Sequence, residues 1–193
     1  YGIRLSGKKL PQLILPITTI GYAAPGAVLG IGILVPLAFM DNWIADQIFD
    51  FTGYDPGLVF TGTAFAIILA YCVRFFSIAQ QTVDGAFGRV SPSLPNAARS
   101  LGRNKLQVLW EIYRPIMSTS IATALLLVFV DCVKELPATM LLRPFNFETL
   151  ATRVHVQASL EDLPNAAPGA ILIVLIGLFA VFLLARVNTQ NSN

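Results

Sequence analysis

Long apolar runs alternate with short polar segments along this chain. Four of the runs reach or approach the roughly 20 residues that an α-helix needs to cross a bilayer. The predicted spans are residues 20–40, 57–76, 116–134 and 166–185. Together they predict one all-α domain over residues 1–193, a polytopic membrane helix bundle of about four transmembrane helices.

Composition supports an integral membrane protein. Hydrophobic residues make up 55% of the chain and charged residues only 12%, whereas soluble domains carry roughly 25% charged residues. The mean hydropathy is +0.67. A net charge of +2 is too small to indicate a nucleic-acid partner.

The distribution of basic residues predicts the orientation of the spans. Three Lys and Arg residues lie in residues 1–10 and five in the loop 77–115, whereas the loop 41–57 has none and carries four aspartates. Because cytoplasmic loops are enriched in Lys and Arg, we expect the loop 77–115 in the cytoplasm and the loop 41–57 outside. Arg74 is expected to extend from the end of the second span toward the membrane surface.

Apolar residues recur at helical spacing in the first half of the loop 77–115. Val83, Phe87, Val90 and Leu94 predict one apolar face of a helix that lies along the membrane surface. A second short helix is expected to follow Pro95 and to run to Leu101.

The second half of this loop predicts a turn and another helix. Gly102 suits a left-handed position that ends the preceding helix, and Asn104 suits the N-cap of the next helix. The apolar face of that helix is Leu106, Leu109, Trp110 and Tyr113. Pro115 is expected to interrupt or kink it. The pattern fits equally well a basic loop that fixes topology and a helix–turn–helix that docks on a partner.

The spacing within this helix–turn–helix resembles the hallmark of binding-protein-dependent ABC transporter permeases, E-A-A, three residues, G, nine residues, I-x-L-P. The corresponding residues are Asn96, Ala97, Ala98, Gly102, Ile112, Arg114 and Pro115. Five of the seven specified positions match. Asn96 replaces the preferred glutamate and Arg114 the preferred leucine.

Two further segments are similar to the ferric-iron permease subfamily. Residues 21–26 read GYAAPG, close to the GYALPG of that subfamily, and residues 134–152 resemble its segment after the coupling loop. Such permeases commonly fuse two halves of about six spans each. This chain resembles the last four spans of the second half, which predicts further spans before Tyr1.

The resemblance implies a subunit of an ATP-driven importer in the bacterial inner membrane. A binding protein would deliver the substrate, ferric iron in this subfamily, to a path formed with the other permease half, fused or separate. The segment 97–102 of this helix–turn–helix would seat in a cleft on one subunit of an ABC ATPase homodimer. Arg99, Arg103 and Lys105 would contact acidic groups there. ATP-driven closure would rock the spans between two orientations. The chain itself would need no cofactor and would not be an enzyme.

Other functions remain open at this point. Thiamine or a phosphonate could replace iron as cargo of a permease. An ion-coupled secondary transporter would show inverted repeats, and a membrane-embedded enzyme would need a cluster of acids or a His/Cys/Asp site. The sequence shows neither of these patterns.

Charged residues near the end of the third span form a candidate translocation path. Asp131, Lys134 and Glu135 lie at or near membrane depth, where ionisable residues are costly and often functional. Asp131 and Lys134 have the spacing of a helical ion pair, so they are expected either to form a structural pair or to line the path. Pro137 predicts a bent or re-entrant segment over residues 136–142.

Two smaller features indicate packing or exposure. His155 has no histidine or cysteine cluster around it, so we expect an exposed loop residue and no metal site. Gly26 and Gly30 form a G-x-x-x-G pattern, which permits close helix packing.

Overall fold

The computed structural model describes residues 18–190, with side chains through residue 186. Residues 18–23 are helical and lead into α3. The following elements are Gly26–Thr52 (α3), Phe65–Phe87 (α4), Ser93–Ser100 (α5), Lys105–Val108 (α6), the π-helical segment Leu109–Tyr113 (η1), Arg114–Lys134 (α7), Pro137–Leu142 (α8), Leu150–Ser159 (α9) and Leu163–Gln190 (α10). Residues 18–190 contain no β-strand, so the all-α prediction is confirmed.

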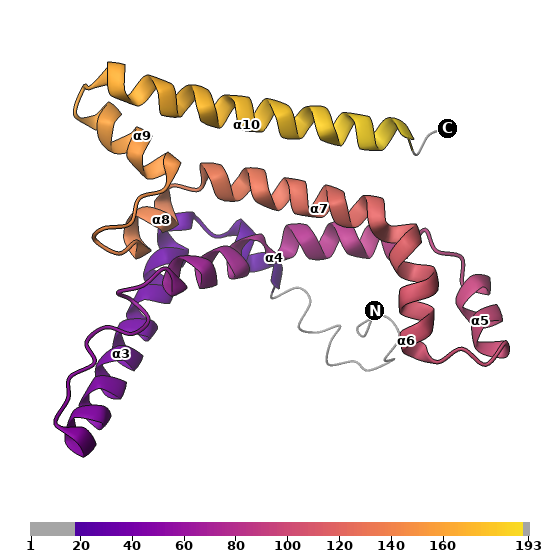
Figure 1. Ribbon diagram of the computed structural model, residues 1–193, viewed down its shortest axis with the longest axis horizontal. Coiled ribbons are helices and arrows are strands. Elements are labelled where there is room, and N and C mark those ends of the chain that lie inside the picture. The colour runs from indigo at the N-terminus through magenta and orange to yellow at the C-terminus, as the bar shows by residue number, and fades with distance from the viewer. Residues whose placement is uncertain (1–17, 191–193) are drawn as a thin grey trace.

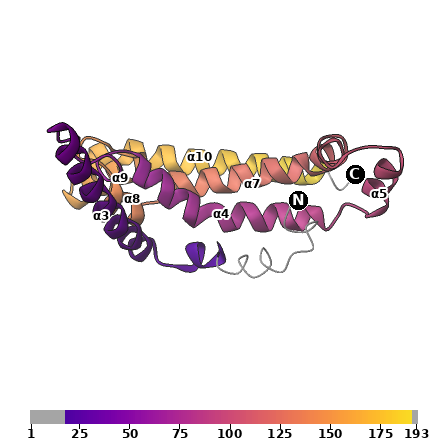
Figure 2. The ribbon, with the colours of Figure 1, turned by 90° about the horizontal axis from the view of Figure 1, so that it is seen from below.

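Three long helices run side by side through the centre of the structure (Figures 1 and 2). The α7 helix packs against both α4 and α10, and α9 folds back onto α10. The α3 helix packs against α8 and extends obliquely away from that end of the bundle (Figure 1). The short helices α8 and α9 lie at one end of the bundle, and α5 and α6 lie at the other.

Four helical segments are long and apolar enough to cross a membrane, as the sequence predicts. They are Gly26–Thr52, Phe65–Gly88, Lys105–Lys134 and Leu163–Arg186. The last of them leaves most of its apolar side chains uncovered, and Phe179, for example, is 64% exposed. Such a surface is stable when it faces lipid or other apolar helices rather than water.

The prediction that a loop begins at residue 41 is wrong, because α3 continues to Thr52. Its first aspartate, Asp41, is fully buried. The carboxylate of Asp41 accepts hydrogen bonds from the backbone N–H groups of Val59, Phe60 and Thr61 at 3.1, 2.8 and 2.7 Å. The helix ends where Gly53 adopts a left-handed conformation with φ of 69°.

The second span is displaced from its predicted range. Residues 59–64 form bends and turns whose first three residues bond to Asp41, and α4 runs from Phe65 to Phe87, well into the predicted loop 77–115. The predicted surface helix is therefore wrong. Val83 and Phe87 belong to the last turns of α4, and with Val90 they pack around Tyr113 and Met117.

The third span begins eleven residues earlier than expected, because one continuous helical path leads from Lys105 to Lys134. Pro115 has no N–H to donate within this path. The turn before it widens into η1, in which the N–H of Arg114 donates to the carbonyl of Leu109, five residues earlier. The helix bends sharply here (Figure 1), which confirms the predicted kink.

Close packing of α3 on α8 explains the two glycines of the G-x-x-x-G pattern. A Cβ atom at Gly30 would lie 3.4 Å from the Cβ of Leu141, and one at Gly26 only 2.7 Å from Oε1 of Glu135. A side chain at either position would push the segments apart. The packing role predicted for these glycines is confirmed.

Candidate functional site: a docking hairpin and a buried ion pair

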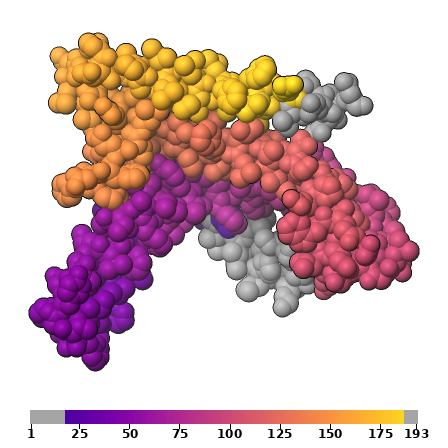
Figure 3. All heavy atoms as spheres, viewed as in Figure 1, coloured from indigo at the N-terminus to yellow at the C-terminus, as the bar shows by residue number. Residues whose placement is uncertain are grey.

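Residues 93–113, here called the hairpin, project beyond one end of the bundle (Figures 1 and 3). A left-handed residue turns the chain between α5 and α6: Gly102 has φ of 84°. The N–H groups of Gly102 and Arg103 donate to the carbonyls of Arg99 and Ala98, each at 3.0 Å. These bonds satisfy the last carbonyls of α5, so the left-handed, helix-ending conformation predicted for Gly102 is confirmed.

The start of α6 is fixed by a reciprocal cap. The Asn104 side chain accepts from the N–H of Gln107 at 2.8 Å, and the Gln107 side chain accepts from the N–H of Asn104 at 2.9 Å. Both bonds satisfy N–H groups that have no partner inside the helix. The N-cap predicted for Asn104 is confirmed, and both arms of the hairpin therefore have defined ends.

The two alanines of the hallmark face different surroundings. Ala97 is exposed, as are Asn96 and Arg99 on the same helix. Ala98 instead packs with Ile112 against the apolar cluster around Val108 and Tyr113. Ala97 therefore lies where a partner could approach, whereas Ala98 and Ile112 hold the hairpin together.

The basic residues in and next to the hairpin differ in their contacts and exposure. Nε of Arg103 lies 3.1 Å from Oε2 of Glu111 in a half-exposed ion pair within the hairpin. Arg99 and Lys105 are exposed. The guanidinium of Arg114 lies over the ring of Trp110, 4.8 Å from its centroid, which gives the unusual arginine a local cation–π partner.

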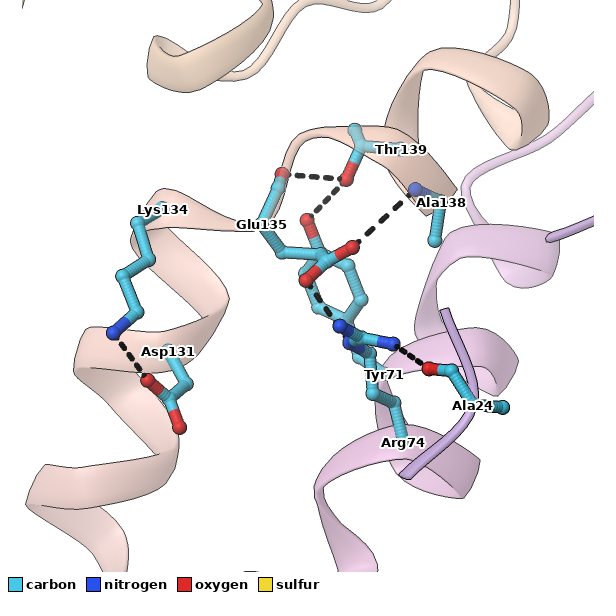
Figure 4. Close-up of polar contacts among 8 residues, drawn as sticks. All are labelled: Ala24, Tyr71, Arg74, Asp131, Lys134, Glu135, Ala138 and Thr139. Atoms are coloured by element: carbon cyan, nitrogen blue, oxygen red, sulfur yellow. Dashed lines mark hydrogen bonds and ion pairs between the residues drawn. The ribbon is translucent and has the colours of Figure 1, made fainter. Parts of the chain in front are cut away.

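A buried ion pair lies near the other end of α7 (Figure 4). Nε of Arg74 is 3.0 Å from Oε2 of Glu135, and the side chains are 17% and 8% exposed. Nη1 of Arg74 donates to the carbonyl of Ala24 at 2.9 Å. Arg74 thus lies within α4 and points into the bundle, and the expectation that it extends from the end of a span is wrong.

Further hydrogen bonds connect this ion pair to α8. The hydroxyls of Tyr71 and Thr139 are 2.6 Å apart, and Thr139 donates to the carbonyl of Glu135 at 2.9 Å. Oε1 of Glu135 accepts from the N–H of Ala138 at 3.3 Å. The contacts join α4 to both ends of the helix break at residues 135–136, and that break confirms the bent segment predicted from Pro137.

The three charged residues of the predicted path fall into two groups. Nζ of Lys134 lies 2.8 Å from Oδ1 of Asp131, which confirms the predicted helical ion pair. Lys134 is exposed, and this pair points away from the Arg74–Glu135 pair in Figure 4. Glu135 is buried and belongs to the other group.

No metal centre is found in the part of the chain that the structure describes, since no three His, Cys, Asp or Glu side chains gather there. His155 is exposed, as expected, but it lies on α9 rather than in a loop.

Comparison with known proteins decides the family. The family model described as "Binding-protein-dependent transport system inner membrane component" matches residues 2–191. The chain belongs to this permease family. Together with the four apolar helices, this makes it a multi-pass inner-membrane protein and a transport component.

Permeases named for different cargoes are similar to this chain. The Fe(3+)-transport system permease protein FbpB 2 of Haemophilus influenzae is 33% identical over 124 residues, which cover 64% of this chain and 24% of that protein. The putative 2-aminoethylphosphonate transport system permease protein PhnV of Salmonella typhimurium is 26% identical over 184 residues, 95% of this chain and 62% of that protein. A probable molybdenum ABC transporter permease of Haloferax volcanii is 27% identical over 130 residues, 67% of this chain and 48% of that protein. The chain spans about a quarter of the ferric relative and less than two thirds of the others.

Sequence reasoning missed Arg74, Tyr71, Thr139 and Asp41 as members of buried polar networks. For Arg74 a signal was present, since an arginine beside a long apolar run is costly in lipid unless it is paired. Its partner Glu135 lies 61 residues later in the chain. Only the packing of α4 against the α7–α8 break brings the two together.

Proposed function

We propose that this permease chain forms part of the membrane path of an ATP-driven importer and that its hairpin docks on an ABC ATPase subunit. A substrate-binding protein supplies the substrate, and another permease half, fused or separate, completes the path. The observation that carries the proposal is the hairpin itself. It combines an exposed Ala97, a left-handed hinge at Gly102 and two helices with defined ends.

The connections of the hairpin support a coupling role. The chain enters it from α4 through the short segment 88–92 and leaves it through η1 directly into α7. Val83 and Phe87 of α4 pack with Val108 and Tyr113 in one apolar cluster. Force on the hairpin therefore reaches two membrane helices through a packed core rather than through a loose loop.

Docking predicts a specific effect of charge at the exposed alanine. Ala97→Glu would bury an unpaired carboxylate in the contact with the ATPase, so retention of the ATPase is expected to fall by about tenfold or more. The measurement is the amount of ATPase that co-purifies with the full transporter. Ala98→Glu is a poorer test, because Ala98 is packed inside the hairpin.

Phe145→Glu is the matched control for this experiment. Phe145 is fully exposed, in the loop after α8 at the end of the bundle opposite the hairpin. The Phe145→Glu substitution introduces the same charge as Ala97→Glu. Co-purification of the ATPase is expected to remain at the level of the parent protein. Normal co-purification of the ATPase with Ala97→Glu would contradict docking through this surface.

Ferric iron is the proposed cargo. The proposal is supported by the similarity to the ferric-transport permease of Haemophilus influenzae and by the two segments 21–26 and 134–152, which meet around Glu135 in the structure. Cargo of another kind, such as a phosphonate, is the alternative, and the similarity to PhnV supports it.

The binding protein that works with this permease provides the test of cargo. Titration with Fe³⁺, 2-aminoethylphosphonate and molybdate is expected to show tight binding of Fe³⁺ alone, and uptake of radioactive iron should require ATP. A binding protein that ignores Fe³⁺ but binds one of the other two ligands would overturn the iron assignment and leave the docking proposal intact.

A further inference from the structure

The helical path is broken between α7 and α8, at the end of the bundle opposite the hairpin. The α7 helix ends at Lys134, Glu135 is extended with φ of −70° and ψ of 115°, and α8 begins at Pro137. A break of this kind exposes backbone polar groups and removes the stiffness of a continuous helix. Something must hold α8 in place if movement of α7 is to reach it.

Arg74 supplies that connection, because it joins three segments of the chain. Its guanidinium contacts the carboxylate of Glu135 at the break and the carbonyl of Ala24 in the turn before α3. Tyr71, one turn earlier on α4, reaches Thr139 on α8. Two residues of α4 therefore contact the break: Arg74 binds Glu135 at the end of α7, and Tyr71 binds Thr139 on α8 (Figure 4).

The packing of α3 extends the same unit. Gly26 lies against the side chain of Glu135 and Gly30 lies against Leu141. In both places a hydrogen atom fits but a Cβ atom would be crowded, so α3 packs closely on the start of α8. Thr139 and Leu142 of α8 are almost fully buried in this contact region. The α3 helix, the first half of α4 and α8 therefore share one closely packed interface.

Separation of these segments would be costly. A charge left without its partner in a buried, low-dielectric site is strongly unfavourable, and both charges here are more than four-fifths covered. The neighbouring Asp131–Lys134 pair differs in one partner: Asp131 is 18% exposed, but Lys134 is 62% exposed and can leave the carboxylate without being buried alone. The energetics favour a pair that stays closed while the transporter moves.

We propose that Arg74 is a positioning residue that clamps α3, α4 and α8 into one rigid unit, so that movement of the hairpin is transmitted across the helix break to α8. The inference rests on the proposed transport function and deepens it, since it states which helices move together. The clamp lies at the end of α7 that is far from the hairpin, and it needs no change in its own contacts during the cycle.

A disulfide between α3 and α8 tests whether the unit is rigid. The ideal Cβ–Cβ separation of 3.4 Å between positions 30 and 141 is close to the range of disulfides, about 3.5–4.5 Å. Gly30→Cys with Leu141→Cys is made in the full permease with Cys72→Ala and Cys132→Ala, and ATP-driven uptake in vesicles is compared before and after oxidation. Uptake is expected to stay within about twofold.

Two results of the disulfide experiment would overturn the proposal. One is a loss of uptake on oxidation that a reductant restores, because α3 and α8 would then have to separate in each cycle. The other is failure of the disulfide to form, because the close packing would then be absent. The reduced double variant controls for the added side chains.

Substitution of Arg74 tests its part in the clamp. Arg74→Lys keeps the charge and is expected to retain uptake per ATP hydrolysed within about threefold, whereas Arg74→Met is expected to lose about tenfold or more while ATP hydrolysis continues. The control is Arg143→Met, which breaks a partly exposed ion pair with Glu148 at 3.5 Å and is expected to have no effect.

The readouts separate this proposal from the docking proposal. Loss of the clamp leaves the ATPase bound and active but uncoupled, whereas loss of docking removes the ATPase from the complex. Normal uptake per ATP in Arg74→Met would overturn the clamp. If Arg74→Met fails to accumulate in the membrane, the disulfide experiment still tests whether α3 and α8 move as one unit, and a loss of uptake per ATP in Arg74→Lys beyond about threefold would contradict the part assigned to Arg74.

Discussion

Gly102→Pro is expected to abolish coupling between ATP hydrolysis and transport while the membrane bundle stays folded. Proline fixes φ near −65° and has no N–H, whereas Gly102 has φ of 84° and donates to the carbonyl of Arg99. The turn between α5 and α6 must therefore rearrange. We expect uptake to fall by about tenfold or more in vesicles that contain the full transporter, with little change in thermal stability in detergent.

Alanine substitutions show whether the backbone conformation is the cause. A Cβ at Gly102 or at Gly85 would meet nothing within 4 Å, so neither variant is hindered sterically. Gly102→Ala carries the left-handed strain of about 1–2 kcal/mol and should reduce uptake partially. Gly85→Ala lies inside α4 and should be neutral or slightly stabilising. Full uptake by Gly102→Pro would show that the turn is not needed for coupling.

Asp41→Ala is expected to cause the largest loss of stability. It removes a fully buried carboxylate that accepts three backbone N–H bonds and a fourth from the Thr61 hydroxyl at 2.6 Å. The bends and turns at residues 59–64, which place the start of α4, then lose their anchor. We expect a loss of about 2–4 kcal/mol, because hydrogen bonds to a charged group are worth more than neutral ones.

Two milder variants calibrate this result. Asp41→Asn keeps one carbonyl oxygen and should lose part of the stability, and Thr61→Val removes only the hydroxyl bond and should lose about 1 kcal/mol. The measurement is the thermal transition of the purified permease in detergent. A transition of Asp41→Ala within a degree of the parent would show that Asp41 does not hold the turns.

The hairpin could be predicted in detail because its signals are local. A glycine at a left-handed turn and an asparagine that caps the next helix act on neighbours within about four residues. Gly102 and Asn104 therefore behave in the structure as the sequence indicates. Which of the two alanines is exposed depended on the cluster around Tyr113, and the spacing alone did not reveal it.

Two of the errors occur where a charged residue finds a distant partner. Asp41 was placed in an outer loop because a charge ends an apolar run, yet its partners at residues 59–61 allow α3 to continue past it. Arg74 was placed at a membrane surface for the same reason, and Glu135 accounts for its burial. A hydropathy profile includes the unfavourable free energy of burying a charge, but it does not include the tertiary contact that offsets this free energy.

By itself, the sequence determined that this chain forms an all-α membrane bundle with about four spans, and it located the left-handed turn and the cap of the hairpin. These features follow from long apolar runs and from conformational preferences of single residues, which need no distant contact. The tertiary structure decided the ends of the spans, the burial of Asp41 and the Arg74–Glu135 pair. The reason is physical: a buried charge is stable only beside its partner, and folding alone brings together residues that lie 18 to 61 positions apart.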